Sequence, residues 1–412
     1  MDITIHRGTK EIGGTCIQLT SSGGSILLDI GQPLGKDSTV IDLSKLQFDS
    51  VLVSHPHQDH FGLIDSLDPS IPIYIGESGK DLIELTRVFL KREPLKNDFH
   101  HFEKWKPFDV CGFRVTPYLV DHSAVDAYAF LIEAEGKRVF YSGDFRAHGR
   151  KSILFDKMVS KPPVNIDALI MEGTMLDRSN DDFPDELSVG KKIEDTIRHF
   201  DGIAFLLASS QNIDRIVSAY NACLRTGRTF VIDLYTAWVL DRLKKISKSL
   251  PVMDWDNVKV YMIGGHYEAL KANKGYFGEF TKRAFDHRVF DNELIESPSR
   301  YLYFGKMSSS KEIEMLKTHG RVSVIYSQWL GYLNRPEHQG YHSIKIAAYR
   351  DDPQVDFIYA HTSGHATVED LKTFAAALKP KMLIPVHTEH AERYSDYFEN
   401  VVMLNDGENM HF

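Results

Sequence analysis

Three histidines and an aspartate lie within six positions near the start of the chain, in the segment Ser54-His55-Pro56-His57-Gln58-Asp59-His60. The segment follows the apolar run Val51-Leu52-Val53, which predicts that it leaves the end of a buried strand. Alternate residues of an extended chain point the same way, so His55 and His57 can face one point while Asp59 and His60 turn toward a second. Neutral imidazole and carboxylate suit zinc, manganese or iron, and the absence of thiolate argues against a purely structural cysteine site. We therefore interpret the segment as a metal site rather than as a histidine-rich surface loop.

This spacing resembles the metal-binding signature of the metallo-β-lactamase superfamily. The resemblance implies three further ligands, and candidates follow short apolar runs: His122 after Phe113–Leu119, Asp144 after Arg138–Phe140 and His387 after Met382–Val386. Such runs predict buried strands, so we expect the ligands at several strand ends of one α/β scaffold. The resemblance also implies that Asp29, at the end of another predicted strand, supports the ligands. A carboxylate that caps a turn is the alternative for Asp29.

The length of 412 residues allows about two domains. From about Leu187 to Val355, predicted helices and strands alternate without a further strong metal cluster, a pattern typical of a βαβ-type parallel sheet. Because Asp144 and His387 must meet at one metal pair, this region is best explained as an insertion. The predicted fold is α/β: a metallo-β-lactamase αββα sandwich from residues 1–180 and 356–412, with an inserted domain at residues 181–355.

A lactamase core with such an insertion resembles the β-CASP group, the nucleases of the superfamily. Glu172, His365 and His387 match the three motifs of that group, and histidine at the last of them is typical of RNA-directed members. Within the group, Gly8-x-x-Glu11-Ile12-Gly13 and Asn212-Ile213-Asp214-Arg215 are similar to segments of ribonuclease J. Two departures are that Asp214 stands where that family usually has histidine, and that residues 326–330 match a family segment only in part.

The resemblance implies a metal-dependent ribonuclease that hydrolyses RNA phosphodiester bonds with a hydroxide activated by two metal ions. It allows 5′–3′ exonuclease activity and endonuclease activity. His55, His57 and His122 would hold one cation, Asp59, His60 and His387 the other, and Asp144 would bridge them. Two Zn²⁺ ions are expected first, with Mn²⁺ as the alternative.

The same resemblance assigns roles beyond the ligands. His365 is expected to protonate the leaving 3′-oxygen, and Glu172 to orient His365 and stabilise its charged form. Asp59 is expected to be catalytic as well as a ligand. The family's His-x-Ser-Gly-His stretch helps to hold a nucleotide phosphate, so His361, Ser363, Gly364 and His365 are expected substrate contacts. The alternatives are a turn or helix cap for Glu172 and a buried, hydrogen-bonded histidine for His365.

Other functions are compatible with part of the sequence. A DNA-directed β-CASP nuclease is the main alternative, followed by a hydrolase of the same superfamily that acts on a small ester or lactam. Such hydrolases generally lack the large insertion and the pair Glu172 and His365. A diiron redox protein would want a flavin-binding partner domain, and a non-catalytic scaffold would have lost ligands. All seven ligand positions are filled here.

Composition limits the cellular context. The net charge of −9 is not that of a globally basic nucleic-acid binder, although bound metal would neutralise several carboxylates. No apolar run approaches the roughly 20 residues of a membrane span, and residues 1–6 do not resemble a secretory leader. Three cysteines without motif spacing suggest buried free thiols. We expect a cytoplasmic protein whose partner is RNA, or DNA in the alternative, with no membrane association; a homodimer is compatible with the sequence.

Overall fold

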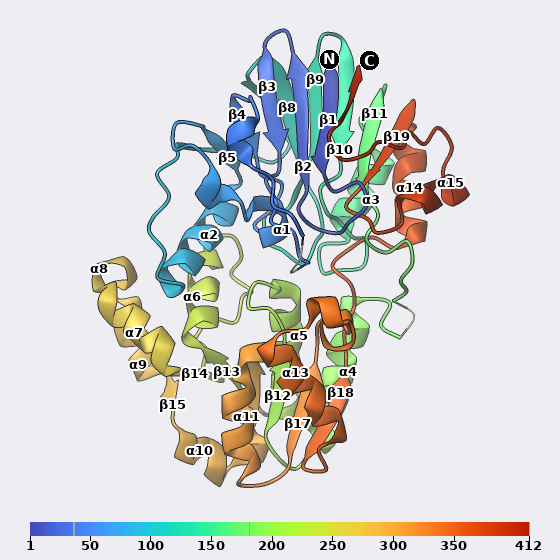
Figure 1. Ribbon diagram of the computed structural model, residues 1–412. Helices are drawn as coiled ribbons and strands as arrows, with labels where there is room; N and C mark the ends of the chain where they lie inside the picture. Colours follow the sequence, from blue (N-terminus) through green and yellow to red (C-terminus); the bar gives the residue numbers. More distant parts are fainter. Residues whose placement is uncertain (36–37, 181, 412) are drawn as a thin grey trace. The chain divides into compact units, whose positions relative to one another are not determined.

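The computed structural model describes residues 1–35, 38–180 and 182–411, which form two compact units (Figure 1). The first unit comprises Met1–Ile83, Leu95–Asn180 and Gly364–Phe412, and the second comprises Glu84–Pro94 and Asp181–Ser363. The expected domain boundary at Asp181 falls on a residue outside the described ranges. Each unit has its own sheet system and is considered by itself.

The first unit contains two sheets. The first sheet has seven strands in the order β20 (Glu408–His411), β1 (Asp2–Arg7), β2 (Cys16–Ser21), β3 (Gly24–Leu28), β4 (Ser50–Leu52), β5 (Ile73–Ile75) and β6 (Phe99–His101). The second has six strands in the order β19 (Met382–Val386), β11 (Ala168–Glu172), β10 (Lys137–Tyr141), β9 (Tyr128–Ala134), β8 (Phe113–Leu119) and β7 (Phe108–Val110). Both sheets mix parallel and antiparallel pairs.

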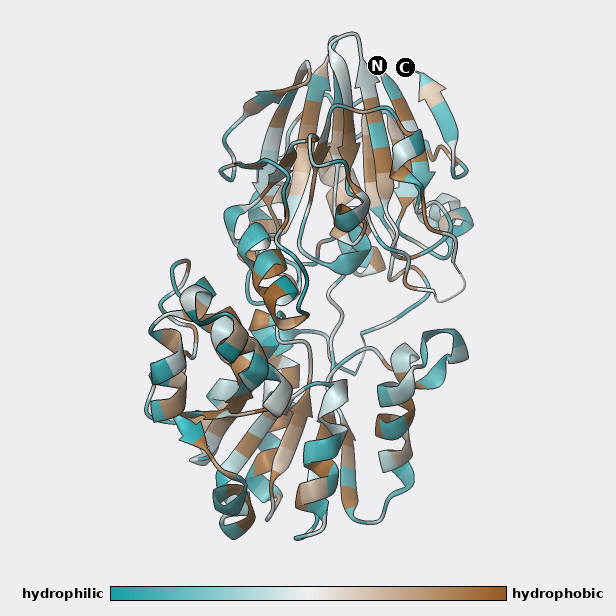
Figure 2. Ribbon diagram, turned by 60° about the vertical axis from the view of Figure 1, so that its left-hand side comes forward, coloured by the Kyte–Doolittle hydropathy of each residue, from teal (hydrophilic) through white to brown (hydrophobic). Residues whose placement is uncertain are grey.

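Central strands such as β3 and β11 are apolar on both faces because each sheet lies between two layers. In β3, Ile26 and Leu28 pack in the core between the sheets, whereas Leu27 points to the opposite face, as the two-residue period of a strand requires. Brown bands along the strands in Figure 2 mark these apolar residues. Helices cover the outer faces: α1 (Gln58–Phe61) and the start of α2 (Glu77–Phe89) on the first sheet, and α3 (Ile153–Ser160) and α14 (Val368–Leu378) on the second. A short helix, α15 (Tyr394–Tyr397), follows β19. The αββα sandwich is confirmed.

Phe130 lies in the core between the two sheets, and its replacement tests how tightly that core is packed. Its side chain is fully buried in β9, with its ring centroid 5.5 Å from that of Phe102. Phe130→Ala is expected to lower the free energy of unfolding by about 3–5 kcal/mol, because it removes buried apolar surface and leaves a cavity. Urea denaturation followed by circular dichroism measures the change. Phe130→Leu should cost clearly less, and equal losses for the two variants would contradict a tightly packed core at this position.

The second unit is built on a parallel sheet. The order is β15 (Arg288–Val289), β14 (Val258–Tyr261), β13 (Thr229–Asp233), β16 (Tyr301–Gly305), β12 (Ala204–Leu207), β17 (Val322–Tyr326) and β18 (Val355–Tyr359), and each neighbouring pair is parallel. Its helices are α4 (Glu186–His199), α5 (Ile213–Thr226), α6 (Leu234–Leu243), α7 (Gly264–Ala272), α8 (Lys274–Phe277), α9 (Phe280–Asp286), α10 (Asp291–Glu296), α11 (Ser310–Lys317), α12 (Gly331–Asn334) and α13 (Tyr341–Ala348). Parallel strands need crossover connections, which these helices supply.

Two features of the second unit differ from the expectation. Strand β16 was not predicted, although it lies in the middle of the sheet between β13 and β12. Residues 356–361, expected to reopen the first domain, instead belong largely to β18, which pairs with β17 from Val322↔Val355 to Tyr326↔Tyr359. The first unit therefore resumes at Gly364 rather than at Asp356. A buried strand has the same apolar pattern in either unit, so its pattern alone could not assign it.

Among residues 1–35, 38–180 and 182–411, no helix combines the length and the apolar character that a membrane span needs.

Candidate metal centre

The strand directions of the first unit bring the predicted ligands to one edge. In the second sheet β8, β10 and β19 run the same way, because β9 is antiparallel to both β8 and β10, and β11 is parallel to both β10 and β19. His122, Asp144 and His387 follow the carboxyl ends of these three strands. His55 follows β4 of the first sheet in the same manner. Residues separated by more than 300 positions thus meet in one place.

The short helix α1 places the second half of the motif. Asp59 and His60 lie in its first turn, and its backbone is tied down by Ile30 N–H, which donates to His60 O at 2.8 Å. Gly31 lets this helix approach, since a Cβ atom added there would lie 1.8 Å from Asp59 O. Any residue other than glycine at position 31 would push Asp59 away from the site.

His55, His57 and His122 form one group of donor atoms. His55 Nε2 and His122 Nε2 each lie 3.2 Å from His57 Nδ1. In a tetrahedral zinc site with bonds of about 2.0–2.1 Å, neighbouring ligand nitrogens are about 3.3 Å apart. The spacing of the three nitrogens therefore fits three ligands of one cation.

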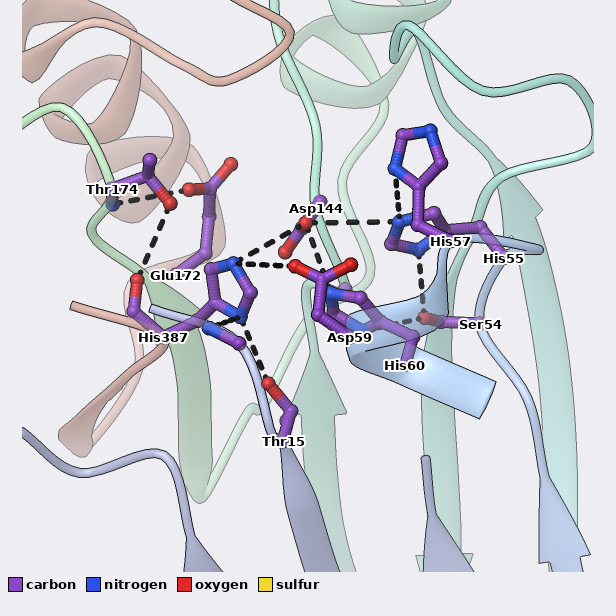
Figure 3. A network of polar contacts seen from close by, with 12 residues as sticks. Thr15, Ser54, His55, His57, Asp59, His60, Asp144, Glu172, Thr174 and His387 are labelled. Carbon is purple, nitrogen blue, oxygen red and sulfur yellow. Dashed lines mark hydrogen bonds and ion pairs between the residues drawn. The ribbon is translucent and has the colours of Figure 1, made fainter. Parts of the chain in front are cut away.

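Asp59, His60 and His387 form a second group, with Asp144 between the two groups (Figure 3). Asp144 Oδ2 lies 3.0 Å from His60 Nε2, 3.6 Å from His387 Nε2 and 3.7 Å from His55 Nε2. His387 Nε2 is 3.8 Å from Asp59 Oδ2. A carboxylate that contacts both groups is in the position that a bridging ligand requires.

The polar atoms of this cluster fit divalent cations. His387 Nε2 and Asp144 Oδ1 are buried and have no hydrogen-bond partner among the residues that the structure describes. An unpaired buried polar atom costs about 1–3 kcal/mol, so such atoms in a folded protein call for a partner. A cation would accept lone pairs from both. The mixed imidazole and carboxylate donors suit Zn²⁺ or Mn²⁺.

The outward-facing ring nitrogens have acceptors that fix the rings. His60 Nδ1 donates to Asp29 Oδ2 at 2.7 Å, and His122 Nδ1 donates to Gly364 O at 2.6 Å. Carboxylate and carbonyl oxygens only accept, so both Nδ1 atoms carry a proton, which leaves Nε2 of the neutral His122 ring with a lone pair for a cation. Gly364, expected to contact substrate, thus also orients a candidate ligand.

His387 is held in an uncommon backbone conformation. Its φ angle is +51°, in the left-handed region that non-glycine residues seldom adopt. The backbone N–H donates to Gly8 O at 2.7 Å, the carbonyl accepts from Thr174 Oγ1 at 3.3 Å, and Nδ1 lies 2.8 Å from Thr15 Oγ1. These contacts stabilise the strained geometry and aim Nε2 at Asp144. Thr15 and Thr174 were not predicted.

Asp29 organises the base of the site. Besides His60, it accepts hydrogen bonds from Ser54 N–H at 2.7 Å, Ser54 Oγ at 2.8 Å and Tyr141 OH at 2.6 Å. Ser54 and Tyr141 were also not predicted. The only signal for them is position, since Ser54 precedes the histidine motif and Tyr141 ends the strand before Asp144. Their hydroxyl contacts depend on the pairing of distant strands.

Asp29→Ala is expected to weaken divalent-metal binding by about 10–100-fold, because His60 loses the acceptor that fixes its ring. Competition between the protein and a chromogenic chelator measures the affinity. Asp68→Ala, which removes an exposed carboxylate of the same unit, is the matched control. An unchanged affinity for Asp29→Ala would show that this contact does not support the site.

Burial controls the protonation of the ligands. It holds the pKa values of His55, His122 and His387 well below the ordinary histidine value, and the neighbouring imidazoles add to the effect. Burial and His60 lower the pKa of His57 to about 4, against the attraction of Asp59. These rings are therefore neutral near pH 7, the form that binds a cation. For His60, burial is outweighed by Asp144 and Asp29, which raise its pKa well above the ordinary value.

His365 lies beside the cluster and contacts Glu172. Its Nδ1 is 3.0 Å from Glu172 Oε2 and 3.2 Å from Oε1. Glu172 is 1% exposed and is itself fixed, since it accepts hydrogen bonds from Phe145 N–H and Thr174 N–H, each at 3.2 Å. His365 Nδ1 therefore donates to Glu172. Burial lowers the pKa of His365, but the Glu172 and Asp144 carboxylates overcome this and raise it.

The remaining predicted substrate contacts, His361 and Ser363, belong to the second unit. His361 Nδ1 lies 3.3 Å from Ser327 O, just past the end of β17. It also lies 3.5 Å from Arg215 Nη1, and Arg215 in turn binds the buried carboxylate of Glu186. The first unit thus contains the seven predicted ligands together with Asp29, Glu172, Gly364 and His365. His361 and Ser363 belong to the second unit.

Two family models match the chain: a beta-lactamase superfamily domain over residues 35–203, and a Zn-dependent metallo-hydrolase RNA specificity domain over residues 357–404. The chain is 21% identical to ribonuclease J of Mycoplasma genitalium, over 98% of this chain and 72% of that protein. It is 23% identical to an RNase J-like protein of Methanocaldococcus jannaschii, over 95% of this chain and 94% of that protein.

A solved structure of a protein of unknown function from Enterococcus faecalis V583 is also similar, with a TM-score of 0.78 over 99% of both chains at 20% identity. That similarity concerns the fold alone. The two family models cover the stretches from His55 to Glu172 and from His361 to His387, where all the candidate ligands lie. The chain therefore contains a beta-lactamase superfamily domain and a metallo-hydrolase RNA specificity domain, and over nearly its whole length it is similar to proteins named ribonuclease J.

Proposed function

We propose that this chain is a ribonuclease that hydrolyses RNA phosphodiester bonds with the help of two divalent cations, with Zn²⁺ as the first choice. The observation that carries the proposal is the convergence of seven imidazole and carboxylate side chains, including the buried unpaired atoms of His387 and Asp144. The similarity to proteins named ribonuclease J and the match to an RNA specificity domain support RNA as the substrate.

Each group of residues has a distinct task in this proposal. His55, His57 and His122 would hold one cation, and Asp59, His60 and His387 the other, with Asp144 in contact with both. When bound, a pair of cations lowers the pKa of a water molecule toward neutrality and neutralises charge on a phosphodiester. Asp29, Thr15 and Gly364 keep the ligand rings in place, so that no reorganisation is needed during the reaction.

His365 supplies the proton that the leaving 3′-oxygen needs. Glu172 accepts the Nδ1 proton of His365, so Nε2 is the nitrogen available to donate to a substrate. The carboxylate also favours the imidazolium form near neutral pH. His365 Nδ1 lies 3.7 Å from Oδ2 of the candidate ligand Asp144, which supports this role.

Glu172→Gln is expected to move the alkaline limb of the kcat–pH profile to lower pH. Glu172 raises the pKa of His365, and the reaction needs the protonated ring, so removing the carboxylate makes His365 lose its proton at a lower pH. Initial rates at saturating RNA, recorded from about pH 6 to about pH 10, measure the position of the alkaline limb. Glu369→Gln, an exposed position on α14, is the control, and an alkaline limb that stays in place in Glu172→Gln would remove Glu172 from this role.

The substrate class is tested with matched RNA and DNA strands that carry a 5′-phosphate, 5′-hydroxyl or 5′-triphosphate. RNA should be cleaved at least about tenfold faster than DNA, which corresponds to about 1.4 kcal/mol in transition-state binding. Release of mononucleotides from a 5′-labelled end would indicate exonuclease action, and internal fragments would indicate endonuclease action. Equal cleavage of DNA, or faster hydrolysis of a chromogenic ester than of either nucleic acid, would overturn the assignment to RNA.

A further inference from the structure

The second unit contains a pocket of about 420 Å³ at the carboxyl edge of its parallel sheet. All the lining residues belong to that unit. They come from the segments that follow β12, β13, β14, β16 and β17, and from the end of α2. The chain places β13 on one side of β12, with β16 between them, and β17 on the other side. In open parallel sheets, the crevice outside the strand ends at such a change of direction is where ligands bind.

The pocket wall presents hydrogen-bond donors that suit an anion. The wall contains Lys306 and His266 but no carboxylate. Lys306 Nζ donates to the buried Asp233 Oδ2 at 2.7 Å, and Asp233 Oδ1 accepts from Thr236 N–H and Thr236 Oγ1, so the ammonium group is held in place. An ammonium has three donors, and within the described residues Lys306 uses one of them in a hydrogen bond. Two N–H donors therefore remain for an anionic ligand.

An aromatic cluster lies next to this ammonium group. The Phe89 ring centroid is 5.2 Å from that of Tyr235 and 5.3 Å from that of His266. Lys306 Nζ lies 4.3 Å from the Tyr235 ring centroid. Aromatic rings beside a cation suit a ligand that carries both a planar aromatic group and a negatively charged group. Nucleic-acid bases stack on aromatic side chains, and phosphate pairs with lysine.

Polar groups of the same pocket wall can form hydrogen bonds with the edge of a nucleic-acid base. Gln211 Nε2 donates to Tyr235 OH at 2.8 Å and to Thr86 Oγ1 at 3.2 Å. The amide is thus fixed, and its Oε1 makes no hydrogen bond to the other described residues, which leaves an acceptor for a base N–H. Ser209 and Ser308 add hydroxyl groups to the wall. A few fixed polar groups around an aromatic surface are typical of small-ligand pockets of this volume.

We propose that this pocket binds one nucleotide unit, with the phosphate on Lys306 and the base against Tyr235 and Phe89. The nucleotide comes either from a free nucleoside monophosphate or from an RNA strand, and both sources present the same chemistry. A divalent cation does not fit, because the wall lacks carboxylates. A purely apolar ligand does not fit either, because it would cover the two remaining N–H donors of Lys306 and Gln211 Oε1 without offering them hydrogen bonds. None of the lining residues belongs to the candidate metal centre, and the assignment does not depend on the proposed hydrolysis.

Calorimetric titration of the full chain with UMP and AMP tests the pocket. The same titrations are made with Asp144→Ala, which disables the metal centre, and with inorganic phosphate and uridine as partial ligands. We expect both nucleotides to bind with equal affinity to the unmodified chain and to Asp144→Ala. Inorganic phosphate and uridine should each bind at least about tenfold more weakly, since each makes only part of the contacts.

A paired variant locates the binding. Lys306→Met combined with Asp233→Asn removes the ammonium group without leaving an unpaired buried carboxylate. It should weaken nucleotide binding at least about tenfold, as expected for a lost charge-assisted hydrogen bond, whereas Lys311→Met, at an exposed lysine of α11, should not. Undetectable binding of UMP and AMP to the unmodified chain, or equal binding to the paired variant, would overturn the proposal.

Kinetics with oligoribonucleotides distinguish the two sources. If the pocket receives a nucleotide of the RNA strand, the paired variant should raise KM at least about tenfold with kcat unchanged. If it receives a free nucleotide, the variant should lose UMP binding while KM stays the same. A chain that binds UMP in the pocket but hydrolyses no RNA would refute the proposed function and leave the pocket assignment intact.

Discussion

Replacement of Asp144 by alanine is expected to lower the rate of RNA hydrolysis by at least about 10³-fold, because in the proposed function Asp144 would hold both cations, whose stabilisation of the transition state is worth several kcal/mol. Asp144 is 2% exposed and its Oδ2 lies within 3.7 Å of nitrogen atoms from His55, His60 and His387. No other described carboxylate contacts all three rings. Initial rates on a labelled RNA, with metal content by elemental analysis of the same preparation, measure the effect.

Asp144→Asn is the matched control for shape. It keeps the size of the side chain and one oxygen but removes the negative charge, so it should bind less metal than the unmodified chain and more than Asp144→Ala. Circular dichroism and thermal unfolding would establish that both variants fold. Full metal content together with a normal rate in Asp144→Ala would show that Asp144 does not bridge the site.

Replacement of His365 by alanine is expected to lower kcat by about 10²–10⁴-fold while the metal content stays the same, as removal of a general acid does. The geometry leaves one rival explanation, because Asp144, His365 and His387 also form a group that could hold a metal ion. If His365 were a ligand, its replacement would release metal. Rates and elemental analysis on the same protein separate these roles.

A substrate with sulfur in place of the leaving 3′-oxygen makes the test sharper. A thiol has a pKa of about 8.5 and leaves as the thiolate without the proton that an alcohol needs. His365→Ala should therefore cleave the sulfur substrate nearly as fast as the unmodified chain does, whereas Asp144→Ala should remain slow on both substrates. An equal defect of His365→Ala on the oxygen and sulfur substrates would remove His365 from the general-acid role.

The histidine motif could be predicted from a local pattern, whereas the sandwich fold and the further ligands His122, Asp144 and His387 were implied by the resemblance to the metallo-β-lactamase superfamily. The run Val51–Val53 predicts a strand, and the spacing after it brings His55 and His57 to one side. Asp144 and His387 are each preceded by a strand, and parallel strand directions then align their ends. The assignment of these residues as ligands remains a proposal that the variants above test.

Other features depend on contacts that a linear pattern does not contain. Thr15, Ser54 and Tyr141 are common polar residues, and they matter only because β2, β4 and β10 bring their hydroxyl groups to His387 or Asp29. Strand β16 was not recognised, because Tyr301–Gly305 is a short run whose place in the sheet depends on pairing with both β12 and β13. The domain boundary predicted at residue 355 likewise depends on strand pairing. Because β18 pairs with β17, the second unit extends to Ser363.

The central claim is that the seven side chains hold a pair of cations. Anomalous diffraction from crystals of the active protein, recorded at the absorption edge of the metal found by elemental analysis, tests it most directly. The account predicts two peaks about 3.5–4 Å apart, with Asp144 between them, His57 at one and His387 at the other. A single peak away from Asp144, or none in protein that hydrolyses RNA, would contradict it.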